Sequence, residues 1–196
     1  MTISRDVFRT GMRHLAAGVC VITTSAHGGG RFGLTATAVC SVSADPPTLL
    51  VCLNNSTTTC KEILESGRFA VNLLAGHDQE IAQVFASPLP PEERFNTGVW
   101  DVLETGAPVL NSAVAGFDCL VKDVVQVATH RIILGDIQAL RCAGADVSPL
   151  LYARGNYGGF LAAESIPLRA THGSLANLHS AEEAQFLEDG LHWGLF

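Results

Sequence analysis

The sequence has few charged residues and no surplus of basic ones. Charged side chains make up 16% of its 196 residues, and acidic residues outnumber basic ones, giving a formal net charge of -7. General nucleic-acid binding is excluded, because displacing counterions from a phosphate backbone needs a basic surplus. Hydrophobic residues reach 47%. So little charge over so apolar a chain favours a large shared interface, most simply that of a homodimer.

The sequence also lacks any C-x-x-C pair. Its six cysteines are scattered, and most of them lie within apolar runs: Cys20, Cys40, Cys52, Cys60, Cys119 and Cys142. This pattern is typical of reduced thiols that act as small core residues, and it argues against a disulfide framework or a metal site.

No apolar run approaches the length of a membrane span, and the segment around Ser4-Arg5-Asp6 lacks the apolar core of a signal peptide. We therefore expect a cytoplasmic protein without a membrane-embedded part. No period of twenty to fifty residues repeats, which excludes a solenoid. The length fits one domain, expected over 1–160, and the composition changes after about Leu161. Residues 161–196 are expected to form a C-terminal extension with a short helix that docks on the domain or on a partner subunit.

Short β-branched segments outnumber helical ones along the chain. The pattern predicts helices over 4–17, 59–66 and 78–86, and strands over 19–24, from Arg31 onward, and over 48–53, 68–74, 115–127 and 129–141. Thr59 and Glu62 form a capping-box pattern for the second helix, and Gly67 is placed to end it. Many strands without regular alternation with helices indicate a mainly β fold, an antiparallel barrel with peripheral helices.

Two polar segments stand out around a buried strand. Residues 33–43 alternate small and hydroxyl-bearing side chains, and residues 54–59 read Asn-Asn-Ser-Thr-Thr-Thr. Pro46-Pro47 and the strand that follows return both segments to the same end of one sheet. Small side chains would let a flat polar ring meet the backbone, and the start of the next helix favours an anion such as phosphate. The two segments therefore predict a flavin or nucleotide site.

A glycine motif nearby is misleading. Gly28, Gly30 and Gly33 satisfy G-x-G-x-x-G, the fingerprint of a dinucleotide-binding βαβ unit. That motif has to open a helix, whereas residues 34–39 contain two threonines and show no helical periodicity. We therefore interpret the glycines as a hairpin turn that requires positive φ.

The order of motifs resembles that of the flavin reductase family with the FMN-binding split-barrel fold, the reductase components of two-component flavin-dependent monooxygenases. The matching pieces are Phe8-Arg9, Gly18-Val19-x-Val21-Ile22-Thr23-Thr24, Gly33-Leu34-Thr35-Ala36-Thr37-Ala38-x-x-Ser41-Val42-Ser43, Asp45-Pro46-Pro47, Asn54-x-Ser56, Ser66-Gly67-Arg68-Phe69-Ala70-Val71-Asn72-Leu73-Leu74, Arg94-Phe95, Trp100, Gly106-x-Pro108-Val109-Leu110, His130 and Tyr152-x-Arg154-Gly155-x-Tyr157. They extend over roughly 5–160. Each piece is weak alone, but the ordered set is specific.

The resemblance implies a site for each part of the cofactor. The isoalloxazine and ribityl chain would lie along Thr35, Ala36, Thr37, Ala38, Cys40 and Ser41. The ribityl and phosphate would be held by Asn54, Asn55, Ser56, Thr57 and Thr58, with Lys61 and Arg94 as charge partners and Phe95 at the border. Tyr152, Ala153, Arg154, Gly155 and Tyr157 would close over flavin and nicotinamide. His130 would lie beside the nicotinamide, as a positioning group rather than an acid or base.

The activity implied is NAD(P)H-dependent reduction of FMN or FAD, with NADH or NADPH as hydride donor. The resemblance further implies a homodimer that supplies free reduced flavin to a flavin-dependent monooxygenase. Two alternatives remain: a flavin-binding carrier or redox sensor without turnover, and an oxygenase in its own right. Two features depart from the family pattern, namely Ala128-Thr129 before His130, and the long segment 161–196.

Overall fold

The computed structural model of the chain describes residues 3–161. The extension expected over 161–196, with its helix, lies outside the described residues apart from Leu161. Seven strands form one antiparallel sheet in the order β3-β2-β6-β9-β10-β5-β4. They are β2 (Cys20–Ser25), β3 (Arg31–Ala36), β4 (Val39–Ala44), β5 (Pro47–Asn54), β6 (Arg68–Leu73), β9 (Ala115–Val127) and β10 (His130–Cys142). The mainly β, antiparallel fold with peripheral helices is confirmed.

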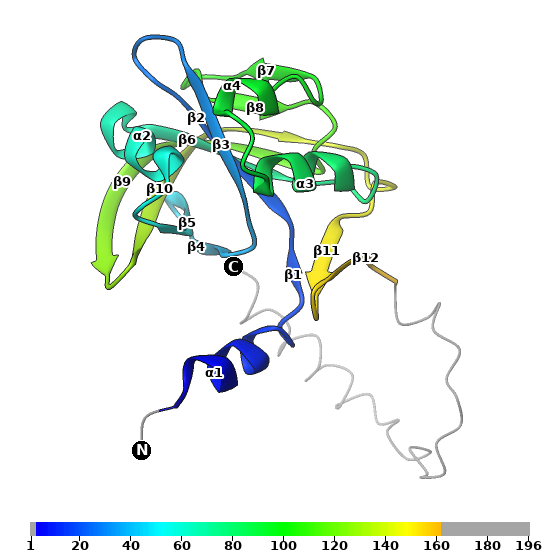
Figure 1. Cartoon of the computed structure of the whole chain (residues 1–196). Coiled ribbons are helices and arrows are strands. Elements are labelled where there is room, and N and C mark those ends of the chain that lie inside the picture. Colours follow the sequence, from blue (N-terminus) through cyan, green and yellow to red (C-terminus); the bar gives the residue numbers. More distant parts are fainter. Residues whose placement is uncertain (1–2, 162–196) are drawn as a thin grey trace, which may run out of the picture.

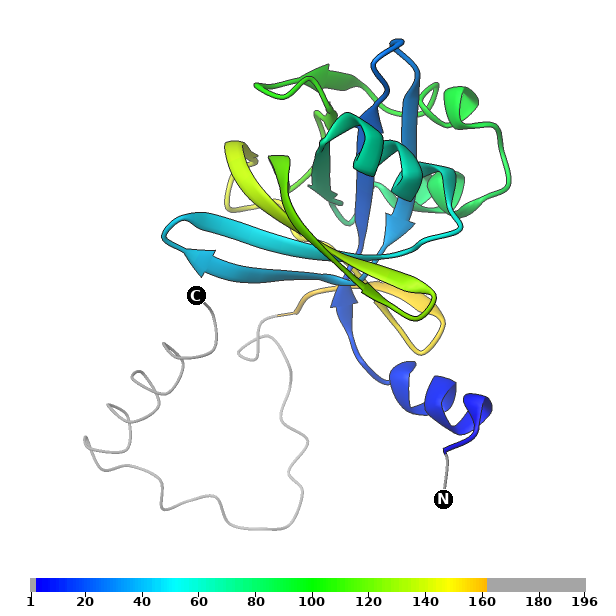
Figure 2. The same cartoon turned by 90° about the vertical axis from the view of Figure 1, so that its left-hand side faces the viewer.

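The two edge strands of this sheet are neighbours in the sequence. β3 and β4 are separated only by Thr37 and Ala38, although they stand at opposite ends of the strand order. The sheet must therefore curl until its edges approach each other at this corner. Figure 2 shows the β2–β3 hairpin upright and the β4–β5 and β9–β10 hairpins crossing below it. β3 pairs with β2 and β4 with β5, but not with each other, so the barrel is split along this line.

Two smaller sheets flank the barrel. β1 (Ala17–Gly18), β11 (Leu150–Ala153) and β12 (Asn156–Gly159) form one of them, and β7 (Trp100–Val102) pairs with β8 (Pro108–Leu110) in the other. The glycine motif lies at the β2–β3 hairpin as expected. Ala26 N–H donates to Gly30 O at 2.8 Å, and Gly29 has φ +89°, which suits glycine.

The second helix begins one position earlier than the sequence suggested. α2 spans Thr58–Ser66, and its N-cap is Thr57, whose Oγ1 accepts the Cys60 N–H at 3.3 Å. The capping box assigned to Thr59 and Glu62 is wrong, because Thr59 is already inside the helix and buried. Gly67 ends the helix with φ +71°, as expected.

Two further helices pack beside β3, namely α3 (Gln79–Ala86) and the short α4 (Pro91–Arg94), which lies in a segment expected to be irregular. The barrel core gathers large side chains such as Ile22, Ile63 and Phe69. A second core lies against α3. It contains three aromatic rings, Phe85, Phe95 and Trp100, with centroids 5.0 to 5.2 Å apart.

The first helix is shorter than expected and stands away from the barrel. α1 spans Arg5–Met12 rather than reaching Ala17, with Ser4 as its N-cap (Figure 1). None of its residues is buried, and Val7, Phe8 and Met12 are 64%, 60% and 48% exposed. The helix is amphipathic, so its apolar side lacks a cover within residues 3–161.

The six cysteines differ in how deeply they are buried. Cys20, Cys60 and Cys119 are buried, Cys52 is half-buried, and Cys40 and Cys142 are exposed. Burial raises the pKa of Cys20 to about 12, and burial together with the nearby Asp118 and Asp136 carboxylates raises that of Cys119 to about 12. All six thiols are free, in line with reduced core residues, although only half of them are fully buried.

Candidate functional site

A cleft of about 490 Å³ opens where the two edge strands meet. The end of β3, the connection through Thr37 and Ala38, and the end of β5 line it, together with α3 and Arg94. Four residues expected from the first polar segment, Thr35, Ala36, Thr37 and Ala38, lie here beside Asn54 and Thr57 from the second. The structure therefore brings the two predicted segments together.

Two more cavities adjoin this cleft. One of about 270 Å³ shares Thr35, Ala36, Thr37 and Ala86 with it and is lined on another side by Tyr152 and Tyr157. The other, of about 610 Å³, lies between α1 and the barrel and shares Thr37, Ala38 and Tyr152 with its neighbours. The segment from Thr35 to Ala38 is therefore exposed to open space on several sides.

Edge strands explain why the cleft suits a flat polar ligand. An edge strand presents backbone N–H and C=O groups that no neighbouring strand satisfies. Here the side chains at the corner are small, so a ring can approach that backbone. The Thr35 hydroxyl cannot donate to such a ligand, because its Oγ1 already donates to Ala82 O on α3 at 2.7 Å. Thr35 thus fixes α3 against β3 and shapes the cleft.

The second polar segment forms a braced loop before α2. Asn54 Oδ1 accepts the Ser56 N–H at 2.9 Å and the Ser56 hydroxyl at 2.8 Å, and the Asn55 N–H donates to Thr129 O at 3.0 Å. Thr57 caps the helix and also lines the cleft. The first turn of α2 therefore carries free backbone N–H groups close to the cleft, as an anion site requires.

Both predicted charge partners lie near this loop, in different settings. Arg94 lines the cleft, and its guanidinium is held by Gly33 O at 2.7 Å and Leu89 O at 2.9 Å. Lys61, Ser56 and Thr58 are exposed and do not line the cleft. Arg131 was not predicted as a charge partner. Burial raises the pKa of Cys60 in the first turn of α2, and the positive charge of Arg131 lowers it by a smaller amount. The buried Arg131 Nε has no hydrogen-bond partner within residues 3–161.

His130 lies at the start of β10, directly opposite Asn54 of β5. The pairing places it beside the loop before α2. Its imidazole is exposed, and Nδ1 shares a hydrogen bond of 2.9 Å with the Thr129 hydroxyl. The threonine that departs from the family pattern thus contacts the histidine and orients the ring.

Other predicted residues lie outside the main cleft. Cys40 and Ser41 are farther along β4, and Phe95 is 4% exposed in the aromatic core, so none of the three lines the cavity. Phe95 is buried because Phe85 and Trp100 pack against it. The turn Ala153, Arg154 and Gly155 joins β11 to β12, where the Arg154 N–H donates to Arg13 O at 2.7 Å.

The tyrosines of β11 and β12 form a pair beside the cleft. Tyr152 and Tyr157 face each other in register, with ring centroids 5.2 Å apart in an edge-to-face arrangement. Burial, and to a lesser extent Tyr152, raises the pKa of Tyr157, so its phenol stays protonated. The pair provides an aromatic wall that a neutral ring can contact.

Several cleft residues were not predicted, namely Leu34, Cys52, Leu53, Phe85, Ala86 and Ser87. Cys52 and Leu53 could have been predicted, since they end the strand that returns the chain to the site. The α3 residues could not have been predicted from the sequence, because only the tertiary packing of that helix on β3 brings them to the cleft.

No helix within residues 3–161 is long and apolar enough to cross a bilayer.

The split antiparallel barrel of this chain is a fold shared with solved flavin reductases. The chain belongs to the flavin reductase family, whose domain model, described as Flavin reductase like domain, matches residues 12–160. A curated relative, FMN reductase (NADH) RutF of Ancylobacter novellus, is 41% identical over 152 residues, which cover 78% of this chain and 83% of the relative. This places the chain among the oxidoreductases.

Solved structures agree with this assignment. A nitrilotriacetate monooxygenase component B homologue from Mycobacterium thermoresistibile is 28% identical, covers 90% of this chain and 95% of its own, and superposes with a TM-score of 0.77. BorF, the flavin reductase component of a bacterial two-component tryptophan halogenase, is also 28% identical, covers 80% and 98%, and has a TM-score of 0.73.

Proposed function

We propose that this chain catalyses the reduction of FMN by NADH and releases the reduced flavin to a separate flavin-dependent oxygenase. The observation that carries the proposal is the cleft at the corner of β3 and β4, where small side chains leave edge-strand backbone open. FMN and NADH are preferred over FAD and NADPH because relatives at about 40% identity are named FMN reductase (NADH).

Each part of the cleft has a distinct task in this reaction. Backbone groups along residues 35–38 would hold the flavin ring, and the Asn54–Thr58 loop with the first turn of α2 would hold its phosphate. Arg131 adds positive charge near that turn. Bound flavin and nicotinamide supply the hydride chemistry themselves. The chain's contribution is to position the two rings, with Tyr152 and Tyr157 limiting access of water from one side.

The oxygenase partner is inferred from the solved relatives. One is a monooxygenase component B homologue and the other is the reductase component of a halogenase system. A reductase of this kind has to let its product leave, and the cleft, open on several sides, suits such a release. A reaction that consumes NADH also favours the cytoplasm as its compartment.

A homodimer would cover apolar side chains that are exposed within residues 3–161. Val42, Val125 and Val127 on the barrel are 46%, 47% and 52% exposed, and α1 presents a further apolar face. α1 lines a cavity that adjoins the cleft, and Val127 pairs with His130, which lies opposite Asn54 of the cleft. We therefore infer that a second copy covers them.

The function is tested by anaerobic mixing of the protein with FMN and NADH. The proposal expects the visible absorbance of many equivalents of FMN per protein to be lost, because reduced flavin leaves after each turnover. FAD and NADPH are measured in parallel. A carrier or redox sensor would leave the spectrum unchanged or stop after one equivalent, and that result would reject the reductase proposal.

His130 gives a narrower prediction. Replacing it with alanine is expected to raise the apparent KM for NADH about threefold to tenfold, as loss of one hydrogen-bonding contact predicts, while the Kd for FMN changes less. Steady-state kinetics and flavin fluorescence titration measure the two quantities. His77→Ala, which alters an exposed histidine outside the cleft, serves as the control. Unchanged nicotinamide kinetics in His130→Ala would show that the assigned role is wrong.

A further inference from the structure

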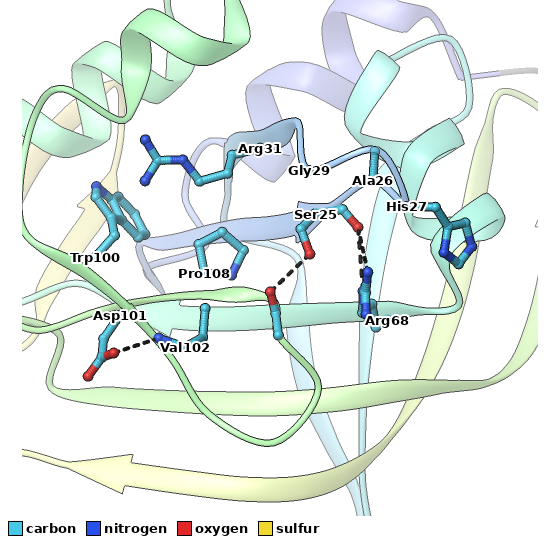
Figure 3. Close-up of a pocket in the computed structure, with 11 residues that line it drawn as sticks. Ser25, Ala26, His27, Gly29, Arg31, Arg68, Trp100, Asp101, Val102 and Pro108 are labelled. Carbon is cyan, nitrogen blue, oxygen red and sulfur yellow. Dashed lines mark hydrogen bonds between the residues drawn. The ribbon is translucent and has the colours of Figure 1, made fainter.

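A separate cavity of about 530 Å³ lies between the β2–β3 hairpin and the β7–β8 ribbon (Figure 3). Its lining includes Ser25, His27, Arg31, Arg68, Trp100 and Pro108, and we call it the arginine groove. It shares no lining residue with the three cavities around residues 35–38. Arg31 and Ala36 stand at opposite ends of β3, about 17 Å apart along the strand.

The groove is basic although the protein is acidic overall. Arg68 donates from Nε and Nη2 to Ser25 O at 3.4 Å and from Nη1 to Thr105 O at 3.0 Å, so its partners are neutral carbonyl groups. The acidic residue of the lining, Asp101, is already engaged by Arg141 at 3.2 Å. Within residues 3–161 no carboxylate pairs with Arg68. Its positive charge is therefore not neutralised.

Arg31 supplies a second guanidinium group. Its Cζ lies 4.7 Å from the centre of the Phe95 ring, and it makes no ion pair or side-chain hydrogen bond in the described part of the chain. Figure 3 shows the Arg31 side chain near Trp100 at one end of the groove and Arg68 toward the other end, with Pro108 between them. A planar guanidinium with free N–H groups is well suited to bind a carboxylate.

Trp100 gives the groove a flat apolar wall. Its indole N–H donates to Thr97 O at 2.8 Å. The half-exposed ring therefore presents carbon atoms to the groove and no N–H group without a partner. Phe85 and Phe95 fix its orientation. An aromatic ring held rigidly in this way favours stacking with another flat ring.

We propose that the arginine groove binds a small planar carboxylate, with its ring against Trp100 and its carboxylate at the guanidinium of Arg31. A cavity of this volume falls within the range of small-ligand sites, about 300 to 1,000 Å³. The two unneutralised guanidinium groups select an anion, and the indole selects a flat one. This site is distinct from that of flavin and nicotinamide.

Trp100 fluorescence provides the test. The sequence has two tryptophans, so the full chain carrying Trp193→Phe reports on Trp100 alone. Benzoate, used as the probe, is expected to quench this fluorescence saturably at millimolar concentration or below. Arg31→Gln should weaken binding at least about tenfold, because a charge-assisted hydrogen bond is lost. Arg5→Gln, on α1 and outside the groove, should bind benzoate normally.

Three further measurements separate the proposal from simpler explanations. Neutral benzamide should bind at least about tenfold more weakly than benzoate, because it lacks the charge that pairs with a guanidinium. Inorganic phosphate, which has no ring to stack on Trp100, should compete only at concentrations well above those of benzoate. In equilibrium dialysis, saturating FMN should leave benzoate binding unchanged. The proposal is overturned if benzoate fails to bind, if Arg31→Gln binds as well as the parent, if phosphate competes equally, or if FMN displaces benzoate.

Discussion

Ala38→Trp is expected to reduce the rate of FMN reduction by NADH at least about 100-fold. Ala38 is exposed, lies in the connection between β3 and β4, and lines both the cleft proposed for the flavin and the cavity under α1. An indole at this position would occupy the space proposed for the flavin ring. Losing about 2.8 kcal/mol of binding corresponds to such a 100-fold effect. Ala38 is not part of either core, so the fold should tolerate the change.

The matched control is Ala44→Trp. Ala44 is also an exposed alanine, at the far end of β4, and it lines none of the cavities around residues 35–38. Its kinetics should remain within about twofold of the parent, as is usual for surface substitutions. Thermal unfolding of both variants checks that the fold is intact. Retention of FMN binding and turnover by folded Ala38→Trp would place the flavin elsewhere.

Six of the seven barrel strands were predicted because their signals are local, whereas β4 was not separated from the strand expected from Arg31 onward. The hairpin at Ala128-Thr129 and the strands it joins, 115–127 and 129–141, lie within a residue of β9 and β10. The β-branched residues of those segments need no tertiary information to favour strands. Helix boundaries were less accurate. Residues 13–17 were expected to continue the first helix, but α1 ends at Met12. The N-cap of α2 is Thr57, two positions before the predicted Thr59.

The two polar segments that line the cleft were recognised for the same reason. The small and hydroxyl residues 35–38 and the Asn54–Thr57 loop are sequence features, and the structure brings them together in one cleft. Nothing local shows that β3 and β4 are the two edges of the sheet, which is what opens their backbone to a ligand. Nor does any local pattern show that Phe95 turns into the aromatic core, or that Asp118 is buried to satisfy Thr105.

Asn72 joins the barrel to the β7–β8 ribbon through buried hydrogen bonds. Its Nδ2 donates to Val21 O at 3.0 Å and to Thr23 Oγ1 at 3.2 Å, and its Oδ1 accepts the Leu110 N–H at 2.7 Å. Thr23 in turn donates to Pro108 O at 2.5 Å. Asn72 and Thr23 are fully buried. A polar group that loses its hydrogen-bond partner here therefore cannot bind solvent water instead.

Asn72→Leu is therefore expected to lower the free energy of unfolding by about 2 to 4 kcal/mol. Leucine has a similar volume, but it leaves the Leu110 N–H buried without an acceptor, and each such orphaned group costs about 1 to 3 kcal/mol. For a chain of this length the Tm should fall by about 5 to 15 °C.

Calorimetry of Asn72→Leu and of the control Asn96→Leu measures how much the buried hydrogen bonds contribute to the stability of the fold. Asn96 is exposed and its side chain makes no hydrogen bond within residues 3–161, so its replacement should change stability by about 0.5 kcal/mol or less. Equal effects of the two variants would mean that Asn72 contributes only its volume. A large effect at Asn72 alone, with the KM for NADH retained, is the expected result, because Asn72 holds the ribbon that carries Trp100 and Pro108 but lines no part of the cleft between the edge strands.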